Sequence, residues 1–142
     1  MLQGTPSVTA DPSYTLTIYG HPIMKDGTSL KVNSDDIALT AAMLASKVEY
    51  LGRFTTTDGM IFDKKGNLYL GDLERYRIVK IDPHLHMSVL IEDHRLIWPD
   101  SYQVSDDGYL YVSCSQIHRQ PAYNNGVNKR TTPYKIYKIK LT

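Results

Sequence analysis

An internal repeat with an offset of 42 residues is the feature that most constrains how this chain folds. The segment DGMIFDKKGNLYLGD, residues 58–72, aligns without a gap on DSYQVSDDGYLYVSC, residues 100–114. In each copy a short run leads to a polar turn ending in glycine, Gly66 or Gly108, and a second run of β-forming residues follows. Glycine supplies the positive φ that a tight hairpin turn requires. The sequence therefore predicts the same β-hairpin twice.

Further strands are predicted after each hairpin. The first copy continues with β-rich runs at 75–81 and 86–91. Four antiparallel strands in about 42 residues is the content of one β-propeller blade. The second copy inserts a long polar loop at 115–133 before an alternating strand at 134–141. A loop of that length inside a compact unit is usually either functional or mobile.

The N-terminal third carries weaker signals. A strand is predicted at 14–19 and a turn at Asp26-Gly27, and Asp35 stands where a third copy begins. A short helix is then predicted at 41–50, with Thr40 as its N-cap.

We therefore predict an all-β partial β-propeller of about two to three blades with one short helix. The predicted parts are an irregular N-terminus at 1–13, an incomplete blade at 14–50, a blade at 51–92, and a blade with a long loop at 93–142. Three units cannot close a ring, because propellers close with about four to eight blades. Open blade faces then predict self-association or membership of a longer protein.

Composition excludes several classes of partner. The chain has 16 Lys+Arg against 15 Asp+Glu, so no basic excess predicts a nucleic-acid partner. No apolar run approaches the length of a membrane span, and the first residues have no signal-peptide pattern. The single cysteine, Cys114, has no partner for a disulfide and no zinc-ligand spacing around it.

Three aspartates hold the same position in the repeat, namely Asp35, Asp58 and Asp100, each at the start of a blade's innermost strand. Carboxylates that converge from neighbouring blades can bind a hard cation such as Ca2+ or hold an ammonium group of a small molecule. The alternative is that each aspartate accepts hydrogen bonds from backbone amides of its own turn. The sequence leaves both interpretations open.

Four more residues are candidate ligand contacts: Asp72, Trp98, Gln116 and His118. Gln116 and His118 stand two apart after a strand, and His118 can act as a general base or as a ligand contact. Trp98 can stack on a ligand or pack between blades. Solvent exposure explains Asp72 equally well, and a structural role explains the histidine.

Residues 57–83, 93–121 and PYKIYKIKL at 133–141 resemble the C-terminal part of the major royal jelly protein/Yellow family. The likeness is closest to microbial members labelled dopachrome-tautomerase-related, and it covers residues 46–141, with patches at 20–40. It implies a six-bladed propeller, an extracellular protein, and a central channel that binds small amines or other small molecules. It also implies a second function, dopachrome tautomerisation.

The chain departs from the family in two places. The N-terminal half of the family pattern is absent, and about half a blade is missing between Thr40 and Ala41. The resemblance therefore predicts a truncated propeller segment without activity. The DGM motif is also similar to that of gluconolactonase-type propellers, whose aspartate binds a metal, which implies Asp58 as a metal ligand. A metal-dependent lactonase, in which the ion polarises a carbonyl and activates water, is thus a further enzymatic alternative.

Overall fold

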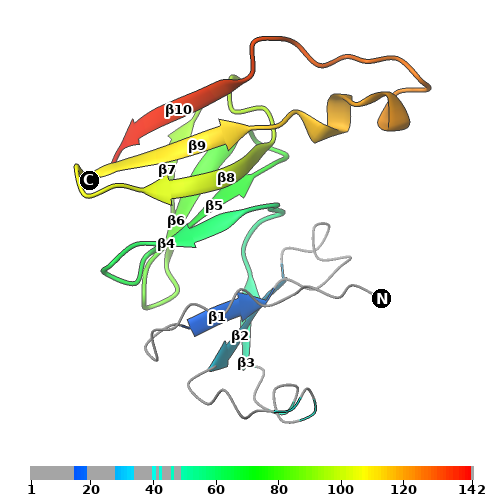
Figure 1. Cartoon of the computed structure of the whole chain (residues 1–142). Helices are drawn as coiled ribbons and strands as arrows, with labels where there is room; N and C mark the ends of the chain where they lie inside the picture. The colour runs from blue at the N-terminus through cyan, green and yellow to red at the C-terminus, as the bar shows by residue number, and fades with distance from the viewer. Residues whose placement is uncertain are drawn as a thin grey trace. The chain divides into compact units, whose positions relative to one another are not determined.

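The computed structural model describes residues 15–18, 28–33, 40, 42, 46 and 49–141 (Figure 1). The chain divides into two compact units, residues 1–55 and 56–142. The strands of the described segments form antiparallel sheets, so the prediction of an all-β fold is confirmed.

The first unit holds a three-stranded sheet in the order β1-β2-β3. Its strands are β1 (Thr15–Ile18), β2 (Thr28–Asn33) and β3 (Glu49–Arg53). The predicted turn at Asp26-Gly27 and the predicted repeat residue Asp35 lie outside the described residues.

The helix predicted at 41–50 is wrong at its C-terminal end. Ala42 and Ser46 are helical, whereas Glu49 and Tyr50 begin β3 and pair with β2. Helix propensity is a weak preference, and pairing with a neighbouring strand overrides it here.

The second unit begins with a four-stranded sheet in the order β4-β5-β6-β7, drawn in green in Figure 1. Its strands are β4 (Met60–Phe62), β5 (Leu68–Asp72), β6 (Arg77–Ile81) and β7 (Met87–Glu92). The four predicted strands of the first copy are thus confirmed. The third starts at Arg77 and not at Arg75, because Tyr76 adopts a left-handed φ of 53° and belongs to the turn.

A three-stranded sheet follows in the order β10-β9-β8. Its strands are β8 (Pro99–Val104), β9 (Tyr109–Cys114) and β10 (Lys135–Lys140). The predicted loop between β9 and β10 is confirmed, and it contains two 3-10 turns, η1 (Ile117–Arg119) and η2 (Pro121–Tyr123). Asn125 and Gly126 form a turn in this loop, with φ values of 51° and 82°.

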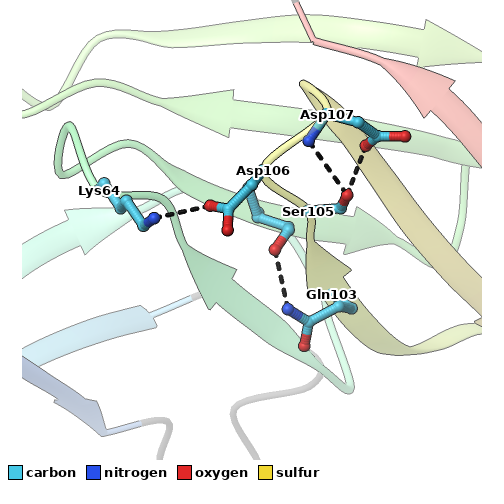
Figure 2. Close-up of polar contacts among 6 residues, drawn as sticks. Lys64, Gln103, Ser105, Asp106 and Asp107 are labelled. Carbon is cyan, nitrogen blue, oxygen red and sulfur yellow. Dashed lines mark hydrogen bonds and ion pairs between the residues drawn. The ribbon is translucent and has the colours of Figure 1, made fainter.

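The two hairpins repeat each other in detail. Gly66 and Gly108 have φ values of 80° and 81°, as the repeat predicts. Lys64 and Asp106 stand 42 residues apart at equivalent turn positions, and their charged groups meet at 2.6 Å (Figure 2). Figure 2 also shows Ser105 hydrogen-bonded to Asp107 within the second turn.

The core of the second unit lies between its two sheets. Its buried members come from both sheets and from the β7–β8 connection: Tyr69, Ile78, Leu96, Leu110, Val112, Cys114 and Ile139. Burying one such large aliphatic side chain contributes about 1.5–3 kcal/mol, so this cluster holds the sheets together. Packing brings the start of β4 against β8, where backbone meets backbone at Gly59.

Candidate functional site

Three of the predicted site residues come together in the second unit: Asp58, Trp98 and His118. The indole Nε1–H of Trp98 donates a hydrogen bond to Oδ2 of Asp58, with a distance of 2.7 Å between nitrogen and oxygen. The imidazole of His118 stacks on the indole, with 5.4 Å between ring centroids and 26° between planes. These residues, which we call the Trp98 cluster, precede β4, precede β8 and follow β9 respectively.

The backbone around Trp98 explains this convergence. The pairing of β8 with β9 continues past both strands, because the Ser115 N–H donates to the Trp98 carbonyl at 3.0 Å. The Gln116 N–H donates in turn to the Ile97 carbonyl at 3.4 Å. Trp98 is thereby fixed at the root of the long loop, because its partner Ser115 stands two residues before η1, the turn that contains His118.

Two residues of this region adopt a left-handed backbone. Trp98 has a φ of 59° and Gln116 a φ of 53°. For residues other than glycine such a conformation costs on the order of 1–3 kcal/mol, and such positions cluster at ligand-binding and active sites. The backbone strain at Trp98 and Gln116 therefore indicates that this part of the chain holds particular side chains in fixed positions.

Asp100 lies beside Asp58 in the fold. A Cβ added at Gly59 would lie 1.7 Å from the Asp100 carbonyl oxygen, which shows how closely the segments approach. Burial, and then the negative charge of Asp58, raise the pKa of Asp100, while the neighbouring Ser115 side chain lowers it. The site thus combines an exposed carboxylate with a half-buried one of raised pKa.

His118 is partly buried, and its surroundings favour the neutral form of its imidazole. Burial lowers the pKa of its imidazole, and the positive charge of Arg119 lowers it further. Its Nδ1 is buried and has no hydrogen-bond partner among the residues that the structure describes. A neutral imidazole can bind a ligand or accept a proton.

Stability should therefore fall as the pH drops below about 6.5, the ordinary pKa of histidine. In that window the unfolded chain binds a proton at His118 that the folded chain excludes, so the free energy of unfolding decreases. Urea unfolding at pH 7 and pH 5 measures the loss, and His118→Gln should reduce it. An equal loss in His118→Gln and in the original chain would contradict the lowered pKa.

Gln116, another predicted ligand contact, joins two parts of the long loop. Its side chain is buried, its Nε2 donates to the Thr131 carbonyl at 2.8 Å, and its Oε1 accepts from the Thr131 N–H at 3.0 Å. The amide therefore joins the two ends of the long loop. Arg119 adds a contact of 3.4 Å to the same Oε1.

Asp72 is buried in an ion pair. Its Oδ2 accepts from Nε of Arg77 at 2.7 Å and from Nη1 of Arg75 at 3.3 Å. The Asp72 side chain is almost fully buried, and both arginines belong to the β5–β6 hairpin. Asp35, the remaining candidate, lies outside the described residues.

Two neighbours of the site were not predicted. Ser115 lowers the pKa of Asp100, and Arg119 lowers the pKa of His118. Both stand at the root of the loop. Its length was a signal in the sequence, but no spacing singled out these two residues.

The described residues include no group of three or more His, Cys, Asp or Glu side chains placed to hold a metal ion. Ca2+ takes about six to eight oxygen ligands, of which Asp58 and Asp100 would supply only a minority. One oxygen of Asp58 is already bound to Trp98. Asp58 as a ligand of Ca2+ stays a prediction.

No protein-family model matches the chain, and a search of curated proteins finds no match. Among the described residues, no helix has the length and apolar character that crossing a membrane requires.

Proposed function

We propose that the two sheets of residues 60–140 are neighbouring blades of a β-propeller of the royal jelly/Yellow type, and that the Trp98 cluster binds a small organic amine. The proposal for the fold rests on the repeat and on the resemblance described above. The proposal for the ligand rests on one observation, the exposed Asp58 carboxylate held by Trp98, which itself stacks on His118.

The chemistry of the cluster suits an ammonium group beside an apolar or aromatic body. The indole fixes Oδ2 of Asp58, and among the described residues no hydrogen bond engages the other carboxylate oxygen. An ammonium ion near an indole face gains about 0.5–2 kcal/mol from the ring, in addition to its attraction to the carboxylate. Asp100 adds a second acidic group close by.

Fluorescence of Trp98, the single tryptophan, provides the test. Phenethylamine titrated into the 142-residue chain should change the emission saturably, whereas the neutral phenethyl alcohol should not. Asp58→Asn should weaken binding at least about tenfold, equivalent to about 1.4 kcal/mol.

Glu92→Gln is the matched control, because Glu92 is an exposed carboxylate at the end of β7, the strand at the opposite edge of the sheet from β4. It removes the same charge and should leave the affinity within about twofold. Equal weakening by both variants would reduce the effect to general electrostatics and contradict the proposal.

An enzymatic alternative is favoured by His118 alone. A neutral, partly buried imidazole beside Trp98 is suited to remove a proton in a tautomerisation of a dopachrome-like compound. This alternative requires His118→Ala to abolish the conversion of dopachrome without altering the far-ultraviolet circular dichroism. A rate that equals the uncatalysed one in the original chain would rule it out.

A further inference from the structure

The two sheets of the second unit differ at one pair of equivalent positions. At the end of the β5–β6 ladder, Asp72 pairs in register with Arg77. At the end of the β9–β10 ladder, the equivalent pair is Cys114 and Lys135. The first pair is a buried ion pair with 2.7 Å between nitrogen and oxygen, whereas the second pair has a cation but no carboxylate.

A cavity of about 190 Å³ lies at this second pair. Cys114 and Lys135 both line it, together with Arg95, Ile97 and Tyr137. The walls therefore combine apolar surface with two cationic side chains and with polar groups that include His94 and Gln116. Mainly apolar walls with a few polar groups are typical of small-molecule sites, and a volume below the usual range of about 300–1,000 Å³ suits a ligand of few atoms.

The charges at the cavity favour an anion at its Lys135 side. Asp93 neutralises Arg95 through paired contacts, with Nε at 2.9 Å from Oδ1 and Nη2 at 2.5 Å from Oδ2. Lys135 has no ion-pair partner among residues 49–141. Burial and, to a smaller extent, the negative charge of Asp100 raise the pKa of the Cys114 thiol, but Asp100 does not line the cavity.

We propose that this cavity binds a small organic carboxylate, whose charged group pairs with Lys135 in the place that the Asp72 carboxylate occupies beside Arg77 in the first sheet. The apolar part of the ligand lies against Ile97 and Tyr137. The site is separate from the Trp98 cluster and does not depend on the amine-binding proposal.

Calorimetric titration of the 142-residue chain with sodium benzoate at constant ionic strength tests this site. Benzoate should bind saturably, and Lys135→Met should weaken it at least about tenfold, since the substitution removes the charge and keeps the length of the side chain. Lys140→Met is the matched control on the same strand; Lys140 does not line the cavity, so the affinity should stay within about twofold.

Two further measurements separate the proposal from its alternatives. Cys114→Asp restores the carboxylate of the first sheet and should abolish benzoate binding in a folded chain. The neutral benzamide should bind at least about tenfold more weakly than benzoate. Absence of saturable binding, equal effects of Lys135→Met and Lys140→Met, or equal affinities for benzoate and benzamide would each overturn the proposal.

Discussion

Asp72→Ala should lower the free energy of unfolding by about 3–5 kcal/mol, the cost of removing one partner of a buried ion pair. The Asp72 side chain is 1% exposed and that of Arg77 is 17% exposed, so the guanidinium left behind would have little water to replace the carboxylate. Asp72 also accepts a hydrogen bond from the Arg75 backbone N–H at 3.2 Å, which fixes the turn before β6. Urea unfolding followed by Trp98 emission measures the loss in the second unit.

Two companion variants locate the cause. Arg77→Met in the Asp72→Ala background should recover part of the loss, because it removes the unpaired buried charge. Asp106→Ala breaks the ion pair with Lys64 and should leave the urea midpoint unchanged. The side chains of Lys64 and Asp106 are 88% and 89% exposed, and such surface pairs contribute little to stability. A midpoint for Asp72→Ala equal to that of the original chain would show that the ion pair does not stabilise the sheet.

Gly59→Ala should destabilise the second unit by about 3 kcal/mol or more, at the upper end of what overpacking costs. The added Cβ would meet the Asp100 carbonyl oxygen at 1.7 Å and the carbonyl carbon at 2.9 Å, so only a shift of β4 from β8 can relieve the overlap. Since Asp58 precedes Gly59, the same shift should also weaken amine binding. The urea midpoint and the Trp98 titration measure the two effects.

Gly66→Ala is the matched control for that overlap. Its Cβ would lie 3.5 Å from Pro83, an ordinary contact, so only the positive φ of 80° is strained. Such strain costs about 1–2 kcal/mol, and amine binding should be retained. Equal destabilisation by the two variants would contradict the close approach of β4 and β8.

The sequence predicted the repeated hairpins because their determinants are local. Gly66 and Gly108 specify the turns, and the flanking runs specify the strands. The helix prediction was wrong at Glu49 and Tyr50 because the pairing of β3 with β2 depends on residues about 20 positions earlier in the chain. Such long-range pairing leaves no local pattern.

The candidate site was likewise predicted only in part. The repeat placed Asp58 and Asp100 at equivalent positions, and the structure brings them close together. It did not predict that Gln116 would bind Thr131, because that contact depends on how the long loop returns to β10. Nor could it predict that Asp72 would be buried with Arg77, since an aspartate at a strand end is compatible with exposure as well as with burial.

The most direct test of the account is the indole N–H resonance of Trp98 in a nitrogen-15 correlation spectrum, a single peak because the chain has one tryptophan. Phenethylamine should shift this peak saturably, and the shift should be lost in Asp58→Asn, because ligand binding alters the hydrogen bond from Nε1 to Asp58. An indole peak that stays in place while phenethylamine is added to saturation would contradict the proposed amine site.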